Sequence, residues 1–436
     1  MRVAHFVHRY PPALGGSEAY FARLSKYLTS AGAQVTVFTT TAIDLQAFWS
    51  RRGRCLPAGL TYEDGIEVRR YQPRWRFRGR RYILKPLSLL PVRSWQRLTL
   101  PCNPMAWGML ADAGQADQPF DLVHATAFPY AWPIACGLRL ARRLHLPFLL
   151  TPFLHLGDPD DPKDRTRRAY TTPALLSLIR AADGVFVQTP SEHEALRRYG
   201  IPAERLILLG MGVAEEECTG GDRARARAAW GVLADEVVIG HLANNSREKG
   251  TVDLLQAADQ AWRGGQRFTL VLAGPEMPNF LEFWRTHAPA GRVLRLGVLT
   301  EDQKRDFFAG IDVFALPSRS DSFGLVLLEA WANGVPNIGY RAGGVADVIR
   351  HEHDGLLVRC GDIAGLAEAL AHLTQNADLR QMLGRAGQER TRREFRWQDR
   401  LARVREVYET SITASKRFAP AECQASMGLA SSGRER

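Results

Sequence analysis

The chain of 436 residues is longer than one ordinary hydrophobic core supports, so its length predicts two domains. A content of 45% hydrophobic and 24% charged residues is typical of a globular protein, and no run approaches the roughly 18 apolar residues that span a bilayer. The net charge of +11 favours acidic partners, such as nucleic acid, anionic lipid head groups or sugar phosphates.

The six cysteines are scattered and form no C-x-x-C pair, which argues against a zinc site or a disulfide framework. We therefore expect a reducing, cytoplasmic environment. The N-terminus, MRVAHFVHRYPP, has a short apolar stretch and no small-residue cleavage pattern, so it predicts a first strand rather than a signal peptide.

The first half of the sequence alternates short β-rich runs with polar or proline-marked loops. After the run at 3–7, the loop at 9–16 leads to a helix for which Ser17 is the predicted N-cap. Such alternation predicts a parallel sheet with helices on both faces. The further strands expected in this half lie at 35–39, 122–125, 148–150 and 184–188.

A basic segment interrupts this alternation. No acidic residue occurs from Val68 to Ala111, and basic residues alternate with aromatic ones from Arg69 to Arg97. One interpretation is a solvated insertion over about residues 69–111. Another is a surface that docks on an anionic membrane, with cations on lipid phosphate and aromatic rings in the interface. No recognised nucleic-acid-binding motif accompanies the segment, so we expect no nucleic-acid partner.

The second half repeats the alternation after a glycine-rich, acidic stretch at 210–221, which predicts a connection between two domains. A last helix is expected from Thr391 to about Ser411, and the small and polar residues of the tail at 416–436 predict disorder. The strands expected in this half lie at 237–242, 268–273, 293–296, 313–316 and 336–339, with helices at 251–262 and 301–309.

The most informative segment is FALPSRSDSFGLVLLEAWANG, which begins at Phe314. Asp321 precedes an apolar helix, and Glu329 lies two turns inside it. Free N–H groups and the helix dipole make the N-terminus of such a helix attractive to anions. Two carboxylates beside an anion site suit a ligand that carries both phosphates and sugar hydroxyls.

On these residues the chain resembles the retaining glycosyltransferases of family 4, in the GT-B group, which carry the pattern E-G-F-G-L-x-x-x-E-A. The pattern here reads D-S-F-G-L-V-L-L-E-A, with Asp321 in place of the first Glu. The resemblance implies an α/β fold of the GT-B type, in which two doubly wound Rossmann-like domains face each other across a cleft. The implied parts are an acceptor-binding domain at 1–212, a nucleotide-sugar-binding domain at 213–390 and a helix at 391–415 that crosses back to the first domain.

A second segment, IGHLANNSREKG, departs from the family pattern of Gly-Arg-Leu-x-x-x-Lys-Gly. Lys249 keeps the position that holds the donor diphosphate, whereas Asn244 stands where the family has Arg. An amide donates hydrogen bonds but carries no charge, and Arg247 is the nearby candidate for the missing cation. With Asp321, this makes two departures at donor positions, which we interpret as altered donor geometry.

Two elements of the first domain complete the expected site. His155 follows the strand at 148–150, and the resemblance implies that a His at this strand end touches the donor sugar near the reaction centre. Gly15 and Gly16 precede a helix, where glycines allow a backbone to approach a ligand closely. The resemblance places this glycine pair near the donor phosphate and the acceptor.

The resemblance further implies roles at the donor. Glu329 would accept hydrogen bonds from ribose hydroxyls, and Asp321 would bind hydroxyls of the transferred sugar. The leaving diphosphate would be neutralised by Lys249 and by backbone N–H groups around a loop and helix start. The residues of that loop and helix start are Ser322, Phe323, Gly324 and Leu325.

The expected reaction retains anomeric configuration and needs no cofactor and no metal. The donor would be a UDP-, GDP- or ADP-linked sugar, and the acceptor a glycan or a lipid-linked molecule of cell-envelope polysaccharide or glycolipid synthesis. We expect a cytoplasmic protein, with a peripheral position at the inner face of the membrane if the basic segment docks there.

Three other interpretations remain at this level. A sugar-nucleotide 2-epimerase shares the architecture but lacks the helix from Asp321 to Glu329 in this form. A catalytically weak or inactive nucleotide-sugar-binding, membrane-associated protein is compatible with the two substitutions. A dinucleotide dehydrogenase is disfavoured, because Gly343-Gly344 does not form a G-x-G-x-x-G motif after a strand.

Overall fold

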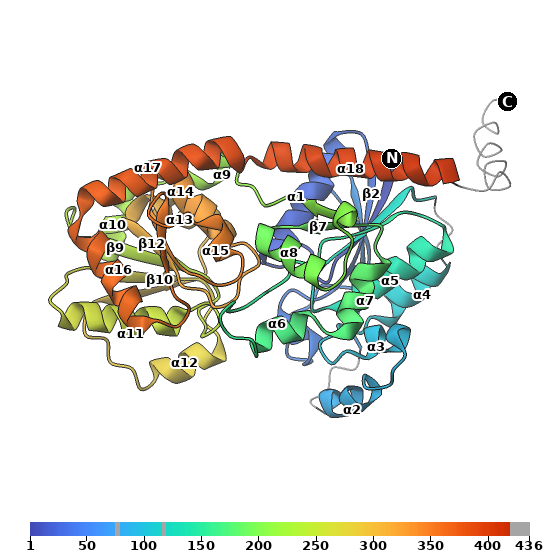
Figure 1. Cartoon of the computed structure of the whole chain (residues 1–436), viewed down its shortest axis with the longest axis horizontal. Helices are drawn as coiled ribbons and strands as arrows, with labels where there is room; N and C mark the ends of the chain where they lie inside the picture. Colours follow the sequence, from blue (N-terminus) through green and yellow to red (C-terminus); the bar gives the residue numbers. More distant parts are fainter. Residues whose placement is uncertain (75–78, 116–118, 419–436) are drawn as a thin grey trace.

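The computed structural model describes residues 1–74, 79–115 and 119–418 and consists of two α/β domains side by side (Figure 1). The first sheet has eight strands in the order β3-β4-β2-β1-β5-β6-β7-β8, all parallel except for β3, which pairs antiparallel with β4. The strands are β1 (Arg2–Phe6), β2 (Gln34–Thr40), β3 (Gly59–Glu63), β4 (Ile66–Tyr71), β5 (Leu122–Ala125), β6 (Phe148–Leu150), β7 (Gly184–Val187) and β8 (Leu206–Leu208).

Helices cover both faces of this sheet, as the alternation predicts. The central strands β5, β6 and β7 are buried on both sides, which is why β6 and β7 read as continuous apolar runs and β5 as an apolar run interrupted only by His124. The helices are α1 (Gly16–Ser30), η1 (Leu45–Phe48), α2 (Arg80–Leu87), α3 (Arg93–Thr99), α4 (Trp107–Gln115), α5 (Ala131–Arg143), α6 (Arg165–Tyr170), α7 (Pro173–Ala181), α8 (Pro190–Arg198) and η2 (Ala203–Arg205). The short helix α9 (Glu215–Cys218) follows in the interdomain connection and contacts the second domain.

The second sheet has six parallel strands in the order β11-β10-β9-β12-β13-β14. Its strands are β9 (Val238–Leu242), β10 (Thr269–Ala273), β11 (Val293–Gly297), β12 (Val313–Leu316), β13 (Asn337–Tyr340) and β14 (Gly355–Val358). Its helices are α10 (Arg223–Trp230), α11 (Thr251–Arg263), α12 (Pro278–Trp284), α13 (Glu301–Gly310), α14 (Leu325–Ala332), α15 (Val345–Val348), α16 (Ile363–Gln375) and α17 (Ala377–Glu394).

The C-terminal helix returns to the first domain. Helix α18 (Trp397–Phe418) runs along one edge of the first domain, as α17 does along the second (Figure 1), and contacts α1. Its Tyr408 hydroxyl bonds to His5 and His124 of the first sheet. The expectation of one helix from Thr391 to about Ser411 is wrong, because α17 ends at Glu394 and α18 starts at Trp397. The break lets the backbone at Phe395 accept a hydrogen bond from the N–H of Val213 in the interdomain connection.

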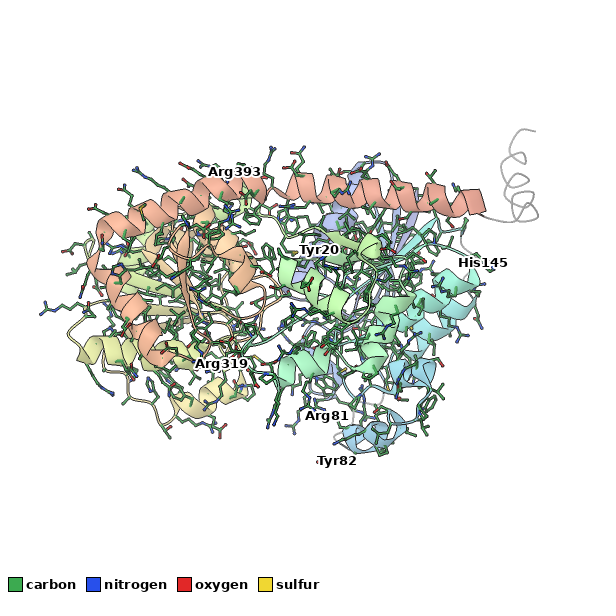
Figure 2. The ribbon with its side chains drawn as sticks, in the orientation of Figure 1. Tyr20, Arg81, Tyr82, His145, Arg319 and Arg393 are labelled. Carbon is green, nitrogen blue, oxygen red and sulfur yellow. The ribbon has the colours of Figure 1, made fainter. Side chains whose placement is uncertain are left out.

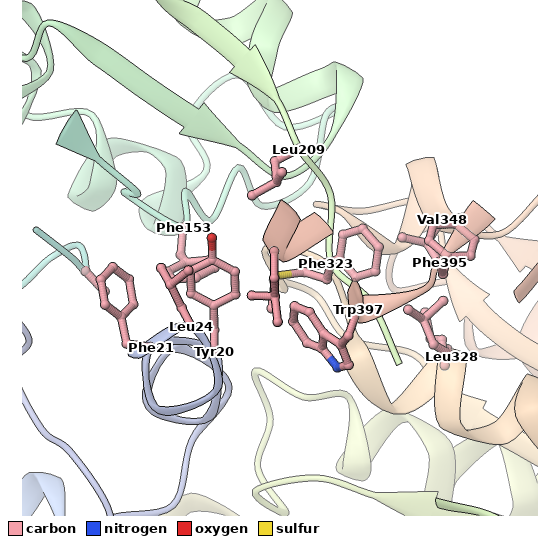
Figure 3. Packing of buried hydrophobic residues seen from close by; sticks show 14 of the residues in the cluster. Tyr20, Phe21, Leu24, Phe153, Leu209, Phe323, Leu328, Val348, Phe395 and Trp397 are labelled. Atoms are coloured by element: carbon pink, nitrogen blue, oxygen red, sulfur yellow. The ribbon is translucent and has the colours of Figure 1, made fainter. Parts of the chain in front are cut away.

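One hydrophobic cluster spans the two domains. Figure 3 shows Tyr20 of α1 beside Phe323 of the second domain and Trp397 of α18, and all three are buried. The rings of Phe323 and Phe395 lie 6.0 Å apart, and those of Tyr20 and Trp397 lie 5.9 Å apart. The domains are thus packed on each other close to the segment that carries Asp321.

The strand β4 changes the interpretation of the basic segment. Arg69 and Arg70 lie on this strand, inside the first sheet, and not on an insertion. Arg69 bonds to Glu67 at 2.7 Å, and Arg70 bonds to Glu63 at 2.7 Å. The prediction that these two arginines belong to a docking surface is therefore wrong, because their charges are already paired within the sheet.

Two further arginines of the segment also hold the fold together. Arg80 is 1% exposed and donates to the carbonyl of Phe48 at 2.8 Å. Arg97 donates to the carbonyl of Ser177 on α7 at 2.9 Å. Residues 75–78, which include Arg76 and Arg78, lie outside the described residues.

The helices α2 and α3 nevertheless expose an apolar face, which we call the α2–α3 face. Tyr82 is 83% exposed and Leu89 is 74% exposed. No helix of the described residues is both long enough and apolar enough to cross a bilayer. The members of the α2–α3 face are Tyr82, Ile83, Leu89, Leu90, Val92 and Trp95.

Candidate functional site

A cavity of about 490 Å³ lies between the two domains. It forms where loops at the carboxyl ends of parallel strands from both sheets face each other, which is where open α/β sheets bind ligands. Arg247 and Glu329 are not among the residues that line it. The predicted site residues on its wall are Gly15, Gly16, His155, Asn244, Lys249, Asp321, Ser322, Phe323, Gly324 and Leu325.

Asp321 lies in the loop between β12 and α14. Its Oδ2 accepts a hydrogen bond from Lys249 Nζ at 2.6 Å, across the two loops that end β9 and β12. Burial opposes the charge of Asp321, but Lys249, His155 and the backbone N–H of Phe323 together hold the pKa of its carboxyl below the usual value. Asp321 is therefore an anion at neutral pH and faces the cavity in that form.

Backbone conformation places Lys249 against this loop. Gly250 has φ +73°, and a Cβ there would lie 1.8 Å from the carbonyl oxygen of Pro317, so only glycine allows the two loops to meet. Below them, buried His241 bonds to the carbonyl of Ala315 at 2.7 Å and to the hydroxyl of Thr251 at 2.9 Å. These contacts fix the turn that presents the lysine.

A second carboxylate–lysine pair lies one helix away. Glu329 of α14 accepts a hydrogen bond from Lys304 Nζ of α13 at 2.6 Å through Oε1, while its buried Oε2 has no partner among the described residues. Burial raises the pKa of Glu329, and this outweighs the opposing effect of Lys304. Lys304 lines the cavity and Glu329 lies behind it. Sequence reasoning missed Lys304, because a lysine on an amphipathic helix is normally a solvated residue.

His155 reaches the cavity from the first domain. Its Nδ1 lies 3.0 Å from the hydroxyl of Ser320, next to Asp321, and its ring lies 4.7 Å from that of Tyr170. Burial, with a smaller contribution from Lys249, lowers the pKa of His155 to about 4. The imidazole is therefore neutral at pH 7 and offers a hydrogen bond rather than a charge.

Glycines 15 and 16 serve different purposes. The N-cap of α1 is Gly15 and not Ser17, whose hydroxyl instead bonds to Glu18 at 2.7 Å. A Cβ on Gly15 would lie 2.3 Å from the carboxylate of Glu18, so this glycine makes room for a buried side chain. Gly16 faces Leu325 across the cavity, and a Cβ on Gly16 would lie 3.9 Å from a methyl group of that leucine. Both glycines line the cavity, and the close approach of their backbone to a ligand stays a prediction.

Glu18 joins a polar cluster that the sequence did not indicate. It is 2% exposed, lies 3.2 Å from His8 Nε2 and forms an ion pair with Arg9. Burial opposes its charge, but His8 and Arg9 hold the pKa of Glu18 at about 2. All three residues line the first-domain wall of the cavity. They sit where the resemblance places the acceptor.

The glycine pair at 343–344 has a structural part in the site. The N–H of Gly344 donates to the carbonyl of Asp321 at 2.8 Å, and a Cβ on Gly344 would lie 2.1 Å from the carbonyl oxygen of Ser322. The N–H of Gly343 donates to the carbonyl of Gly157 in the first domain at 2.9 Å. These glycines hold the Asp321 loop and connect it to the loop that carries His155.

Arg247, the predicted substitute for the cation missing at Asn244, does not line the cavity. Arg247 is exposed, and its guanidinium lies 5.9 Å from the ring of Phe283, away from the cavity lining. The cations that line the cavity within the described part of the chain are Arg9, Lys249 and Lys304. Of these three cations Lys249 was predicted from the sequence, whereas Arg9 and Lys304 were not.

The sequence comparisons fit this arrangement. The family model of glycosyl transferases group 1 matches residues 222–390, and that of the glycosyl transferase 4-like domain matches residues 15–212. A D-inositol 3-phosphate glycosyltransferase of Saccharomonospora viridis is 30% identical over 92% of this chain and 90% of that protein. The N-acetyl-alpha-D-glucosaminyl L-malate synthase of Bacillus anthracis is 32% identical, over 43% of this chain and 49% of that protein.

Solved structures show the same architecture. The sucrose-phosphate synthase of Thermosynechococcus elongatus superposes with a TM-score of 0.72 at 22% identity, covering 95% of this chain and 99% of that one. HepE of Anabaena, in complex with UDP-glucose, gives a TM-score of 0.69 at 18% identity, covering 94% of this chain and 100% of that one. Two facing α/β domains with this cavity define the GT-B fold. The chain belongs to the family of glycosyl transferases group 1, of the family 4 type, which confirms both the resemblance and the fold class.

Proposed function

We propose that this glycosyltransferase moves a sugar from a nucleotide-sugar donor to its acceptor with retention of anomeric configuration. The observation that carries the proposal is a pair of lysine-held carboxylates: Asp321 with Lys249 on the cavity wall, and Glu329 behind the wall with Lys304. Such an arrangement suits a diphosphate flanked by two hydroxyl-bearing rings, because each carboxylate can accept hydroxyl hydrogen bonds while the cations meet the phosphates.

The donor would lie mainly on the second domain. Lys249 and the N–H groups at the start of α14 would stabilise the charge that develops on the leaving diphosphate. The unpartnered Oε2 of Glu329 is the proposed acceptor for a ribose hydroxyl, and Asp321 is the proposed acceptor for hydroxyls of the sugar. Neutral His155 would hydrogen-bond the sugar from the opposite domain.

In the proposed reaction the bond between the anomeric carbon and the diphosphate oxygen breaks as the acceptor oxygen attacks from the same face. The leaving phosphate oxygen takes the acceptor proton. We propose that no metal or other cofactor takes part, since Arg9, Lys249 and Lys304 already bring three cations to the cavity. Activity that survives exhaustive chelation would support this assignment, and activity restored only by an added divalent cation would contradict it.

The donor is proposed to be a UDP-, GDP- or ADP-linked sugar, and the acceptor a glycan or a lipid-linked molecule. Solved structures with UDP or UDP-glucose bound are among the fold neighbours. A cytoplasmic location is supported by the free thiols of Cys102, Cys136, Cys218 and Cys360. The α2–α3 face supports a peripheral position at the inner face of the membrane and a role in cell-envelope polysaccharide or glycolipid synthesis.

The names of two relatives favour a second acceptor class. One is named for L-malate and the other for D-inositol 3-phosphate, and both names denote small anionic molecules. A soluble anionic acceptor is therefore the competing proposal for the acceptor. Sedimentation of the protein with anionic vesicles distinguishes the two, because only a membrane-borne acceptor calls for docking on lipid.

Thermal shift across UDP-, GDP- and ADP-sugars tests the proposed donor, because a ligand that binds the native state alone raises the melting temperature. The bound donor is then incubated without acceptor, and slow hydrolysis to sugar and nucleoside diphosphate is measured. Donor binding that is accompanied by slow donor hydrolysis supports the proposed glycosyltransferase activity. Binding without any hydrolysis, even with a panel of acceptors, would favour the catalytically inactive nucleotide-sugar-binding protein.

A further inference from the structure

A second hollow, which we call the basic pocket, lies on the first domain between η1 and α2. Its volume is about 930 Å³, and its lining includes four cations and, among the described residues, no carboxylate. Figure 2 shows Arg81 and Tyr82 of α2 at the lower edge of this domain. The residues of the basic pocket that matter here are Trp49, Arg52, Arg80, Arg81, Tyr82 and Lys85.

Arg80 is a buried cation without a counter-anion. Its guanidinium donates to the carbonyls of Phe48 and Asn103, and its Nε is buried with no partner. No carboxylate of the described residues pairs with it, and burial lowers the pKa of Arg80 to about 10. A buried charge that is solvated only by carbonyl dipoles favours an anion close by.

The remaining cations line the same space. The guanidinium of Arg81 lies 4.8 Å from the centre of the Trp49 ring, and that of Arg80 lies 5.4 Å from it. Arg52 and Lys85 are exposed, and neither forms an ion pair with a carboxylate in the part of the chain that the structure describes. By contrast, nearby Arg54 is paired with Asp44 at 3.5 Å and does not line the pocket. The fold thus pairs one arginine of this region and leaves the pocket cations unpaired.

The basic pocket adjoins the interdomain cavity. Leu45 of η1 lines that cavity, and the next residue, Gln46, lines the basic pocket. Rings connect the two sites: Tyr130 of the cavity wall lies 5.3 Å from Phe48, which lies 6.1 Å from Trp49. The two hollows thus lie on either side of η1.

We propose that the basic pocket binds a phosphate or diphosphate group of an extended acceptor, whose attacking hydroxyl lies in the interdomain cavity. Two guanidinium groups favour phosphate, because their planar fork matches its oxygens, and an ammonium group adds a point charge. The proposal rests on the proposed function, since it names the chemical class of the acceptor. The phosphate is either that of a soluble glycan or that of a lipid headgroup.

Calorimetric titration of the full chain with inorganic pyrophosphate tests the site. UDP is kept at saturation so that the donor phosphate positions are occupied. The variant Arg52→Ser/Arg81→Ser/Lys85→Ser leaves structural Arg80 intact, and the matched control Arg198→Ser/Arg403→Ser/Lys416→Ser removes the same charge from exposed positions of α8 and α18. We expect at least about tenfold weaker pyrophosphate binding in the pocket variant and less than about a twofold change in the control.

Equal binding by the wild type and the pocket variant would overturn the proposal, as would a wild type that binds no pyrophosphate. Binding of UDP, GDP and ADP is measured first in every protein, and the nucleotide that binds takes the place of UDP at saturation. Absence of binding for all three would count against the proposed donor, and the pocket would then be judged by the difference between pocket and control variants. Failure of the donor proposal is in this way separated from failure of the pocket.

Vesicles distinguish the two sources of phosphate. Sedimentation is compared for vesicles of phosphatidylcholine alone and for vesicles that also contain phosphatidic acid, with and without pyrophosphate. The site would bind a lipid phosphate if vesicle binding needs phosphatidic acid, is displaced by pyrophosphate and is lost in the pocket variant. Pyrophosphate binding without vesicle binding supports the site with the phosphate of a soluble glycan.

Discussion

Lys249 and Asp321 form an ion pair of 2.6 Å across the second-domain wall of the cavity. The two residues are assigned to different parts of the donor, the lysine to the diphosphate and the aspartate to the sugar. In the structure they neutralise each other, with side chains that are 24% and 16% exposed. Donor binding would therefore have to break or share the existing ion pair between Lys249 and Asp321, because neither side chain is without a partner.

Removal of the lysine is predicted to affect both catalysis and folding. Lys249→Ala loses a charge-assisted contact worth roughly 1.5–3 kcal/mol, so turnover should fall at least about tenfold. It also leaves the part-buried carboxylate of Asp321 without its cation, which should lower the free energy of unfolding by about 1–3 kcal/mol. Steady-state kinetics and urea unfolding measure the two effects.

A double-mutant cycle gives the control for this prediction. Lys249→Ala/Asp321→Ala removes both charges, so it should be more stable than the two single losses added together. Strict additivity of the unfolding free energies would show that the pair contributes nothing to folding. Wild-type activity in Lys249→Ala would remove this lysine from the site.

Asp321→Asn is predicted to weaken binding of the sugar nucleotide without weakening binding of the free nucleoside diphosphate. The substitution keeps the size of the side chain and removes the charge that neutralises Lys249. Affinity for the sugar nucleotide should fall, while affinity for the free nucleoside diphosphate should stay the same or rise, because the lysine is released to the phosphates. Dissociation constants for both ligands, measured by calorimetry, check the ratio. Equal losses for both ligands would show that Asp321 does not act on the sugar.

Glu329→Gln is predicted to weaken binding of the sugar nucleotide and of the free nucleoside diphosphate to the same extent. The ribose is common to the sugar nucleotide and the free diphosphate, and loss of a charged acceptor should weaken each by roughly 1 kcal/mol, or about fivefold. Glu368→Gln replaces an exposed carboxylate of α16 and should leave both affinities unchanged. If only the sugar nucleotide were affected, the ribose assignment of Glu329 would be wrong.

The strands that carry these residues were predictable because of their burial. Strands β6, β7 and β12 are buried at every position, so each reads as an unbroken apolar run followed by a polar loop. By contrast, β3 is an edge strand with four exposed residues of five, and its sequence shows no apolar pattern. A short stretch of sequence indicates whether a strand is buried, but it does not indicate which other strand it pairs with.

The side-chain pairs at the site were not predictable in the same way. Asp321 and Glu329 stood out because they fall within one recognisable segment. Their partners Lys249 and Lys304 are 72 and 25 positions away in the chain, on other elements. Arg80 is an extreme case, since its burial depends on carbonyl groups of Phe48 and Asn103. Only the folded chain brings such groups together.

Stability is predicted to fall as the pH is lowered from about 6.5. Burial lowers the pKa of His5 to about 3 and those of His155 and His241 to about 4, and it lowers the pKa of His124 well below its usual value of 6.5. Between these values and 6.5 the unfolded chain binds protons that the folded chain does not, so acid favours unfolding. Glu192, with a pKa raised to about 7 by burial, acts in the opposite direction, as do Glu329 and Asp354, whose pKa values burial also raises, but the four histidines outnumber these carboxyls.

Urea unfolding at pH 7.5, 6.5 and 5.5 measures this dependence. Each fully effective group contributes up to about 1.36 kcal/mol per pH unit, so the slope below 6.5 should be steep. Replacement of Glu192 by Gln should steepen it further, because one opposing group is removed. A free energy of unfolding that is constant or rises toward pH 5.5 would contradict the neutral, buried state of these histidines.

The α2–α3 face is predicted to dock on an anionic membrane surface. Its exposed apolar side chains lie beside Arg81, Lys85 and Arg93, and each cation close to such a surface contributes about 1 kcal/mol within a Debye length. The protein should therefore sediment with anionic vesicles at low salt, and less so at high salt. The apolar contribution is not screened by salt.

Two variants test whether the apolar residues of the α2–α3 face contribute specifically to vesicle binding, or whether loss of any exposed apolar residues weakens it. Ile83→Ser/Leu89→Ser/Leu90→Ser removes the apolar face and should weaken vesicle binding by a similar factor at low and high salt, because the lost contacts are uncharged. The matched control replaces three exposed apolar residues elsewhere, in Leu208→Ser/Leu233→Ser/Met382→Ser, and should bind as the wild type does. If the wild type ignores anionic vesicles at low salt, the face does not dock on lipid, and the soluble anionic acceptor becomes the better assignment.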